Sequence, residues 1–293
     1  MGRFSLRGCS GRGTPGVCIV SLRRCVTPQP VHKVKPWFRV LWRVMIIRAT
    51  FLLALSLAPL PADATQIQEA RPKFASGAVP VLRPDDYLRS NPAPDFWSLL
   101  AFYVPQATDA ACSVASITMA LNAARGLPPF AADPIITQQQ LLERVADERW
   151  VAATAQGGSG VTWAELEHYL REGLRTYQVP AAMEVWRPGD GSAATLQQLR
   201  DLLVDNERSS SDVIIAVFDQ GVLTGDVNIG HVAPIGAYDQ QTRRVLVMDV
   251  DREWYVPYWV ADELLLESML RPGPQDPERG GFLRLRKNEP QTN

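Results

Sequence analysis

The sequence contains few of the residues that cross-link small folds or bind metals, with four cysteines and three histidines among 293 residues. So little cysteine excludes a disulfide-dense scaffold. Glycine and proline, at 20 and 23 residues, are too sparse for a collagen-like chain. Hydrophobic residues make up 46% of the chain, too many for a disordered protein. The composition fits one or two globular domains with ample length for a buried core.

The sequence also lacks a large net charge, but its formal value of -1 averages two unlike parts. Residues 1–64 hold ten basic residues and one acid, Asp63, which leaves 20 basic and 30 acidic residues in 65–293. The cysteines divide in the same way, because only Cys112 lies in the acidic part. An acidic body argues against nonspecific binding to nucleic acid, which requires a basic surface.

Residues 45–64 have the pattern of a secretory signal peptide. A short positive region ends at Arg48, an apolar run extends from Ala49 to Leu60, and an Ala-x-Ala cleavage signal ends at Ala64. The run is shorter than the roughly 20 residues that span a bilayer. The alternative is a buried core helix, but no amphipathic segment flanks the run. The pattern favours export, to the periplasm, without a stable membrane span.

Residues 1–64 are therefore expected to be a leader, and residues 65–293 a single domain of ordinary size. Signal peptides rarely begin as far upstream as residue 1 does here. Residues 1–44 are either an unusually long, Arg-rich leader or a mis-assigned start, with translation beginning at Met45.

The hydrophobic pattern of residues 65–293 changes from helical periodicity to apolar, β-branched runs. Residues 65–98 are rich in proline and polar groups and are expected to wrap the surface. The pattern predicts helices over Ala110–Arg125, Thr137–Trp150, Trp163–Gly173 and Ala194–Leu203. It predicts antiparallel strands over Val213–Phe218, His231–Tyr238, Arg244–Val250 and Gly280–Arg286. Helices followed by strands indicate an α+β domain, with a helical lobe packed on an antiparallel sheet.

Cys112 is the only cysteine outside the leader, so it has no partner there for an internal disulfide. It lies in the first turn of the predicted helix 110–125, for which Thr108 and Asp109 are candidate caps. Free N–H groups and the positive end of the helix dipole favour a thiolate, the reactive form. The alternative is a small buried apolar residue, the commoner fate of a free cysteine.

Two histidines, His168 and His231, lie outside the leader. His168 lies among charges on the predicted helix 163–173, where Thr162 and Glu165 predict a capping box, and we expect it to be solvated. His231 opens a strand. A zinc site would need more cysteine or histidine ligands than these, so we predict no metal site.

Asp249 is predicted to face His231 across a hairpin. If the hairpin is centred on Gln240, the two residues lie directly opposite, with Cβ atoms about 4.5–5.5 Å apart. The carboxylate could then hold the imidazole tautomer while the other ring nitrogen reaches the Cys112 thiol. A slip of one residue would place the two on opposite faces and leave Asp249 as a strand-end carboxylate bonded to a turn. A nucleophile on an early helix, followed by His and a carboxylate on later strands, is the papain-like order.

Three segments resemble the catalytic block of phytochelatin synthases. They are Gln106-Ala-Thr-Asp-Ala-Ala-Cys112-Ser-Val-Ala-Ser116 with Met119-Ala-Leu-Asn122-Ala, Gly230-His231-Val-Ala-Pro234-Ile-Gly-Ala-Tyr238, and Asp249-Val-Asp-Arg252-Glu-Trp-Tyr255-Val-Pro257-Tyr-Trp259. Gly160-Val161-Thr162 is a weaker match. The resemblance covers about residues 100–285. Gln six residues before Cys, Gly-His-x-x-Pro, and Asp eighteen residues after His form a specific combination.

The resemblance implies a papain-like cysteine enzyme that acts on glutathione and its metal thiolates. Cys112 matches the family nucleophile, His231 the general base and acid, Asp249 the orienting carboxylate, and Gln106 the oxyanion-hole side chain. The thiolate would attack the Cys–Gly amide, release glycine and leave a γ-glutamylcysteinyl thioester. Water would then give γ-glutamylcysteine, and a second glutathione would give a phytochelatin. The chemistry needs no cofactor, and metal ions would enter only as substrate thiolates.

Substrate binding is the part that the resemblance defines least. Family members bind substrate carboxylates through an Asp and an Arg just before an Arg-Gly-Phe element. That makes Asp276 and Arg279 candidates here, with the spacing shifted by about one residue. Gly230 and Arg252 are further candidates for substrate binding.

Two positions depart from the family pattern. Ser113 stands where a glycine usually follows the nucleophile. The segment Val217–Gln220 stands where many members carry a Tyr and an Arg, and the lost positive charge puts an acceptor glutathione site in doubt. The chain resembles the short bacterial members, which act mostly as glutathione hydrolases, so we expect water to be the main acceptor.

Two other interpretations remain. A papain-like peptidase or amidase would use the same residues on another substrate, and a catalytically inactive binding module would keep only the fold. The joint presence of Cys112, His231, Asp249 and Gln106 counts against the inactive module. The sequence indicates no oligomeric state.

Overall fold

The computed structural model describes residues 73–81, 85–130, 132, 134–272 and 278–288. The predicted leader, with its signal peptide and alternative start, lies outside the described residues, as does Asp276. Within the described ranges, no helix combines the length and apolar character needed to cross a membrane.

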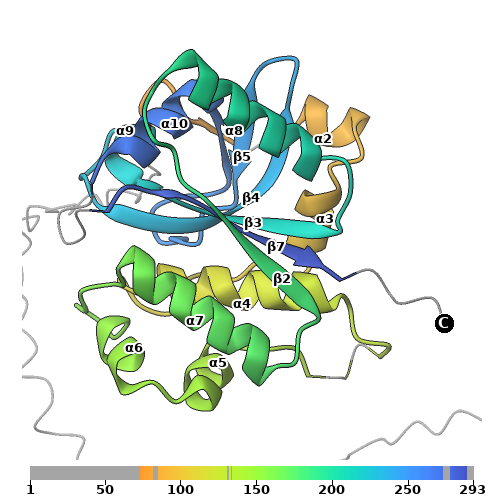
Figure 1. Ribbon diagram of the computed structural model, residues 1–293, viewed down its shortest axis with the longest axis vertical. Coiled ribbons are helices and arrows are strands. Elements are labelled where there is room, and N and C mark those ends of the chain that lie inside the picture. Colours follow the sequence, from red (N-terminus) through yellow and green to blue (C-terminus); the bar gives the residue numbers. More distant parts are fainter. Residues whose placement is uncertain (1–72, 82–84, 131, 133, 273–277, 289–293) are drawn as a thin grey trace, which may run out of the picture. The chain divides into compact units, whose positions relative to one another are not determined.

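A single antiparallel sheet forms the centre of the described fold (Figure 1). Its seven strands are, in spatial order, β1 (Val79–Pro80), β6 (Tyr258–Ala261), β5 (Arg244–Val247), β4 (Gly230–Asp239), β3 (Asp212–Asp219), β7 (Gly281–Lys287) and β2 (Ala181–Trp186). The four predicted strands are therefore present and form the middle of the sheet. The flanking strands β1, β2 and β6 were not predicted.

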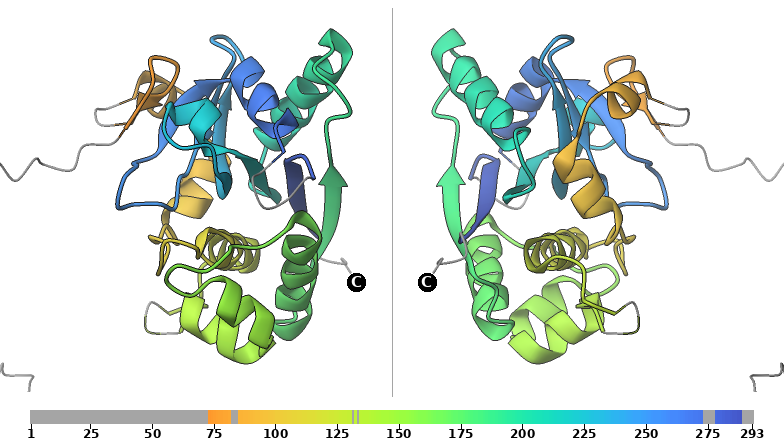
Figure 2. Two further views of the ribbon diagram at one scale, coloured as in Figure 1. Left: turned by 90° about the vertical axis from the view of Figure 1, so that its left-hand side faces the viewer. Right: turned by 90° about the vertical axis from the view of Figure 1, so that its right-hand side faces the viewer.

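Helices cover both faces of this sheet, as the side views of Figure 2 show. One face carries α3 (Pro94–Leu100), α4 (Cys112–Arg125), α5 (Gln138–Val145), α6 (Glu148–Ala153) and α7 (Trp163–Thr176), and the short α2 (Asp86–Ser90) packs against its core. The other face carries α8 (Ala193–Asn206), α9 (Gln220–Thr224) and α10 (Asp262–Leu270). The described chain is thus α+β, as predicted, but the sheet lies between helices instead of under a single lobe.

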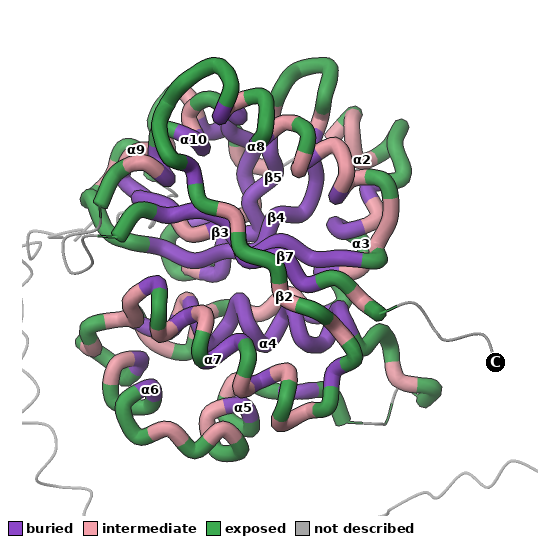
Figure 3. Tube along the Cα trace, in the orientation of Figure 1, coloured by how far each residue is buried: buried purple, intermediate pink, exposed green. Residues whose placement is uncertain are grey.

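Strand β3 explains why both faces are covered. Val213 and Ile215 contribute to the core beneath α4, while Ile214, Ala216 and Phe218 contribute to the core beneath α10. Side chains along a strand alternate between faces, so a continuous apolar run needs a partner layer on each side. Figure 3 shows the consequence, with the central strands and α4 buried together.

Helix α4 is buried on all sides, because every residue from Ser113 to Ala124 is buried. Two of its polar side chains are paired within the fold: the Ser116 hydroxyl donates to the Val232 carbonyl at 2.9 Å, and the Asn122 amide bonds both backbone groups of Ile136. The small side chains of the helix allow it to lie close to β3 and β4. This packing brings the first turn of α4 to the beginning of β4.

Several predicted helices differ in their limits. The capping box of Thr162 and Glu165 is confirmed, and α7 extends beyond the predicted end to Thr176. The predicted helix 137–150 is wrong as one element, because it breaks at Ala146, which has a left-handed φ of 55°, into α5 and α6. Helix α8 is three residues longer than predicted at its C-terminus.

The prediction that residues 65–98 wrap the surface is wrong for its last part. Residues 86–90 and 94–100 are helical. Phe96 and Leu99 belong to the core beneath α4. Pro94 begins α3, where a missing N–H costs no hydrogen bond, so a proline that resembled a loop signal in fact starts a helix.

The hairpin of β4 and β5 has a different register from the predicted one. Tyr238 pairs with Val245, and after a bulge at Gly236 the pairing shifts so that Ile235 faces Val247. Continued along the strands, this register would place His231 opposite residue 251, with Asp249 on the diagonal. A diagonal neighbour on the same face is still within reach of a long side chain.

Candidate active site

Cys112 is the first residue of α4, at the end nearest β4. The residue before the helix is Ala111, and no side chain caps this end. The predicted caps are wrong: the Thr108 hydroxyl donates to the Thr154 carbonyl, and the Asp109 carboxylate accepts from the Gly157 N–H. The first N–H groups of α4 therefore have no side-chain cap and can stabilise a negative charge on the Cys112 sulfur.

His231 and Asp249 form a buried pair, with 4% and 0% of their surfaces exposed. Nε2 of His231 lies 2.9 Å from Oδ1 of Asp249. The Cys112 side chain lies close enough to the imidazole to raise its pKa, and both residues line the same cleft. The structure thus brings together the three residues proposed as a triad, although the hairpin register used to pair two of them was wrong.

The Asp249 carboxylate has donors on both oxygens. Oδ1 accepts the backbone N–H of Asp251 at 2.9 Å as well as the imidazole. Oδ2 accepts the Tyr258 hydroxyl at 3.0 Å and the Gln220 amide at 3.5 Å. A buried carboxylate is stable only when its oxygens are satisfied, and these groups satisfy them. Neither Tyr258 nor Gln220 is predicted for this role from the sequence.

These contacts shift the pKa values of the pair in opposite directions. Burial acts to lower the pKa of His231, but the Asp249 carboxylate and the Cys112 side chain outweigh it and hold the pKa well above its ordinary value. Burial acts to raise the pKa of Asp249, but the charge and hydrogen bond of His231, with the Asp251 N–H and the Tyr258 hydroxyl, lower it overall. Both directions favour an imidazolium beside a carboxylate.

Two hydrogen bonds tie the segment before α4 to the strand end that carries Asp249. The backbone N–H of Gln106 donates to the Val250 carbonyl at 2.8 Å. The Tyr103 hydroxyl donates to the carbonyl of Asp249. The position of Cys112 relative to His231 is therefore set by the sheet as well as by the packing of α4.

A cleft of about 410 Å³ opens between the helical side and the β3–β4 end of the sheet. Cys112, His231, Gln106 and Gly230 all line it. The side-chain oxygen of Gln106 is buried and has no hydrogen-bond partner in the described part of the chain. The segment Gly160–Thr162, the weaker match to the family, also lines the cleft.

Ser113, which departs from the family glycine, is accommodated beside the nucleophile. It is fully buried, and its hydroxyl lies 3.3 Å from the indole nitrogen of Trp150. Trp150 in turn stacks on Tyr169, with ring centroids 4.4 Å apart and planes within 5°. The extra hydroxyl therefore has a partner inside the helical layer.

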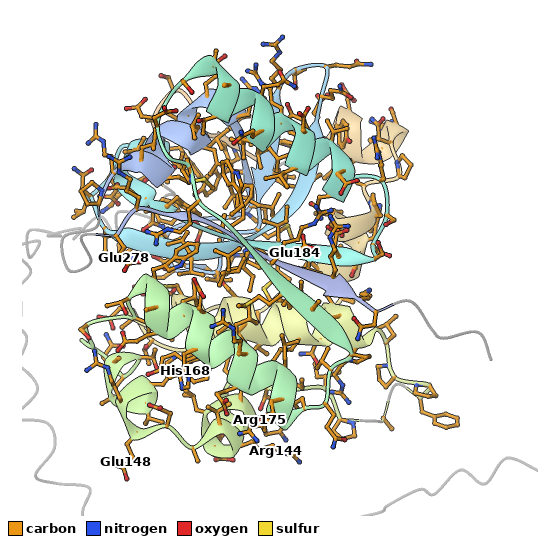
Figure 4. The ribbon with its side chains drawn as sticks, in the orientation of Figure 1. Arg144, Glu148, His168, Arg175, Glu184 and Glu278 are labelled. Carbon is orange, nitrogen blue, oxygen red and sulfur yellow. The ribbon has the colours of Figure 1, made fainter. Side chains whose placement is uncertain are left out.

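The predicted substrate-binding arginines do not line the cleft. Arg252 is exposed and lies over the Tyr103 ring, 4.9 Å from its centroid. Arg279 donates to the Gly189 carbonyl at 2.8 Å. The neighbours of Arg279 do reach the cleft: Glu278, labelled in Figure 4, and Gly280 both line it.

Two other arginines, which were not predicted from the sequence, do line the cleft. Arg149 precedes Trp150 in α6 and pairs with Glu165. Arg271 follows α10 and lies 3.7 Å from Glu267. Both are exposed, so their partners compete with water and could be exchanged for a ligand.

Gly280 lines the cleft at a position where a side chain does not fit. A Cβ atom there would lie 2.0 Å from the Val217 carbonyl oxygen on β3. The backbone of residue 280 is therefore pressed against the sheet. A cation for this part of the cleft has to come from another segment, and Arg271 is one of the residues that line the cleft.

Two further observations concern groups that could bind ions. His168, labelled in Figure 4, is exposed on α7, as predicted. Among the residues that the structure describes, no three His, Cys, Asp or Glu side chains are grouped so that they could hold a metal ion.

A thiol at a helix N-terminus, an imidazole and a buried carboxylate are the parts of a cysteine-nucleophile site. Such a site can form a thioester with an acyl group and transfer it to a second nucleophile. The comparisons with known proteins agree with this class. A sequence model of the phytochelatin synthase family matches residues 85–282, and the chain belongs to that family.

Distant relatives carry a more specific name. Glutathione gamma-glutamylcysteinyltransferase 1 of Arabidopsis thaliana is 25% identical over 207 residues, which cover 68% of this chain and 38% of the relative. Glutathione gamma-glutamylcysteinyltransferase 3 of Lotus japonicus is 26% identical over 184 residues, 59% of this chain and 34% of the relative. The matched region thus spans little more than a third of these relatives.

Proposed function

We propose that this protein is a papain-like cysteine enzyme that cleaves the Cys–Gly amide of glutathione by acyl transfer, mainly to water. The observation that carries the proposal is the buried His231–Asp249 pair at the end of a cleft that also contains Cys112. The family and the name of its distant relatives supply the substrate class.

In the proposed reaction, the Cys112 thiolate attacks the Cys–Gly carbonyl. The Cys112 backbone N–H and the Gln106 amide donate hydrogen bonds to the developing oxyanion. The His231 imidazolium, held by Asp249, gives its proton to the leaving nitrogen, and glycine departs. A γ-glutamylcysteinyl thioester remains on Cys112.

The thioester is then resolved by a second nucleophile. His231, now neutral, takes a proton from water as the oxygen attacks the thioester carbonyl. The C–S bond breaks, the Cys112 thiolate is restored with the protonated imidazole beside it, and γ-glutamylcysteine is released. If the amine of a second glutathione attacks instead, the product is a phytochelatin. Metal ions take part only as thiolates of the substrate.

The cations of the cleft wall support binding of an anionic peptide. Glutathione carries two carboxylates, which need positive partners. Among the described residues, Arg149 and Arg271 are the arginines that line the cleft, where most other charged side chains are acidic. We propose that Arg149 and Arg271 bind these carboxylates, in place of the predicted Arg252 and Arg279. The exposed pairs of both arginines can be exchanged for a substrate carboxylate at little cost.

The proposal is tested by incubating the purified protein with glutathione and measuring glycine release by amino-acid analysis. The wild type should release glycine, and Cys112→Ser should abolish the release. His168→Ala, which changes an exposed histidine outside the cleft, is the control and should keep the wild-type rate. Mass spectrometry of the products, with and without cadmium, separates γ-glutamylcysteine from phytochelatin.

Two other results would favour other functions. Val227 and Ile229 line the cleft with 69% and 47% of their surfaces exposed, and such apolar side chains suit a peptide with apolar residues. Cleavage of such peptides, with glutathione left intact, would indicate a peptidase. No turnover and no labelling of Cys112 by iodoacetamide would indicate a binding module.

The proposed location is outside the cytoplasm. The pattern of residues 45–64 supports it, because it combines a positive start, an apolar run and a cleavage signal. Expression of the full chain with a C-terminal tag should place a protein shortened by the leader in the periplasmic fraction. A full-length protein in the cytoplasmic fraction would contradict export.

A further inference from the structure

Asp251 is a carboxylate of the cleft wall that the proposed reaction does not use. Its backbone N–H donates to Oδ1 of Asp249 at 2.9 Å, the same oxygen that lies 2.9 Å from Nε2 of His231. Because one oxygen holds both groups, residue 251 is fixed beside the imidazole. Its side chain is partly buried and faces the cleft that contains Cys112.

No arginine or lysine is among the charged groups that act on Asp251 in the described part of the chain. The adjacent Arg252 lies over the Tyr103 ring instead. The charged groups that act on Asp251 are His231, which attracts it, and Asp249 and Glu253, which repel it. Asp251 therefore adds a negative charge on the side of the cleft where the imidazole lies.

This is the side on which the acyl acceptor must bind. His231 removes the proton of whichever nucleophile attacks the thioester, so that nucleophile lies within hydrogen-bond distance of the ring. During attack, a C–O or C–N bond forms, the C–S bond to Cys112 breaks, and the proton passes to the imidazole. A nearby carboxylate leaves neutral water unaffected but repels an acceptor that brings its own carboxylates.

We propose that Asp251 selects the acyl acceptor, favouring water and uncharged amines over carboxylate-bearing acceptors such as a second glutathione. The inference rests on the proposed function, because it concerns the second half of that reaction. It also gives a physical reason for hydrolysis to exceed phytochelatin synthesis: the discrimination comes from a charge in the acceptor position. Asp251 is then a specificity-determining residue and takes no proton itself.

The first experiment needs no glutathione. Cys112 is alkylated with iodoacetamide, which is neutral, and with iodoacetate, which carries a carboxylate, and the ratio of the two rates is compared among variants. Both rates depend equally on the thiolate population, so the ratio reports the local charge. Asp251→Asn should raise the iodoacetate-to-iodoacetamide ratio by roughly three- to tenfold, as expected for one charge a few ångströms away in a partly solvated cleft.

Two variants separate a local effect from a general one. Asp251→Glu keeps the charge and should keep the wild-type ratio. Glu253→Gln removes one negative charge from an exposed residue two positions away that is not part of the cleft wall, and it should also keep the ratio. An unchanged ratio in Asp251→Asn, or an equal rise in Glu253→Gln, would overturn the proposal.

The second experiment measures acceptor choice during turnover. The thioester formed from glutathione is trapped with isotopically labelled glycine or with glycinamide, and the labelled glutathione or its amide is measured against γ-glutamylcysteine. Asp251→Asn should increase trapping by glycine roughly three- to tenfold more than trapping by glycinamide. Comparing each acceptor between variants cancels the different basicities of the two amines.

The two experiments keep the two proposals distinguishable. If the wild type releases no glycine, the proposed function is wrong, whereas the alkylation ratio still tests the charge at Asp251. If glycine is released but Asp251→Asn gives the wild-type acceptor preference, the proposed function stands and the role of Asp251 is wrong.

Discussion

The triad region and the rim of the cleft are built in opposite ways. His231 and Asp249 are buried, and each oxygen of the carboxylate has a donor from a different part of the fold. Arg149 and Arg271 on the rim are exposed, and each pairs with a nearby carboxylate. The two regions lie within one cleft but differ in what fixes their side chains.

The difference follows from the free energy of charges in the two environments. A buried charge without partners costs several kcal/mol, so the triad keeps its geometry only if β4, β6, α4 and α9 all supply contacts. An exposed ion pair contributes only about 0–1 kcal/mol, so rim arginines can exchange a protein partner for a ligand. The buried region preserves geometry, and the rim allows adaptation to substrate.

The largest expected effect comes from Asp249→Asn. An amide carries no charge to balance the imidazolium, and its NH2 group would have to face either the imidazole or the Tyr258 hydroxyl, both of which donate to the carboxylate. Glycine release from glutathione should therefore fall by about 10³- to 10⁴-fold. Asp201→Asn, on the exposed surface of α8, removes a carboxylate without touching the pair and should leave the rate unchanged. Retention of more than about a tenth of the wild-type rate by Asp249→Asn would show that the buried pair does not drive the reaction.

A smaller effect is expected from Tyr258→Phe. The change removes the hydroxyl that donates to Oδ2 of Asp249 and leaves that buried oxygen with only the longer contact to Gln220. Urea unfolding should show a loss of about 1–3 kcal/mol. Tyr177→Phe is the matched control, because the Tyr177 hydroxyl is buried without a partner among the described residues, and its removal should cost nothing. Equal stabilities of the two variants would contradict the role assigned to Tyr258.

The rim should respond in binding and not in chemistry. Arg271→Gln removes a positive charge from the cleft wall, so KM for glutathione should rise by roughly three- to tenfold with kcat nearly constant. Arg175→Gln, on the exposed surface of α7 and labelled in Figure 4, should change neither value. A fall in kcat with unchanged KM would place Arg271 with the catalytic residues instead of the substrate-binding ones.

The pH dependence of stability gives the last test of the buried pair. Because folding raises the pKa of His231, its stabilisation is fully present below the ordinary value of 6.5 and is lost as pH rises through the raised value. Because folding lowers the pKa of Asp249, its stabilisation is present above the ordinary value of 3.8 and is lost as pH falls through the lowered one.

Unfolding free energies of the wild type and of His231→Gln, measured across this pH range, check the prediction. The advantage of the wild type over the variant should shrink on the alkaline side, with a slope of no more than about 1.4 kcal/mol per pH unit for one proton. An advantage that grows with rising pH would contradict a raised pKa for His231.

Much of the central sheet could be predicted from the sequence because its signals are local. Strands β3 and β4 are long, mostly apolar runs, and Thr162 with Glu165 marks the start of α7 within four residues. Strands β1, β2 and β6 could not be predicted, since they are short or have exposed residues, and pairing with a neighbour decides their conformation. The break at Ala146 likewise depends on packing and not on a proline or glycine.

The candidate site divides in the same manner. The spacing of Gln106, Cys112, His231 and Asp249 could be recognised as a sequence motif, because it depends only on residue types and their positions. The contact between His231 and Asp249 was not readable in this way. It depends on the bulge at Gly236, which changes the register of β4 and β5 so that Asp249 lies diagonally across from His231. A glycine inside a strand is a local signal for a bulge, but only the paired strands show that the pairing shifts there by one residue.

By itself, the sequence determined the family, the identity of a lone cysteine at a helix start, and the class of the fold. These rest on residue types and on periodicity, which the chain carries before it folds. Only the tertiary structure decided which side chains support the carboxylate and which cations line the cleft. Those choices bring Tyr258, Gln220 and Arg271 from distant segments to one place, and such proximity arises only when the sheet and its two helical layers have packed.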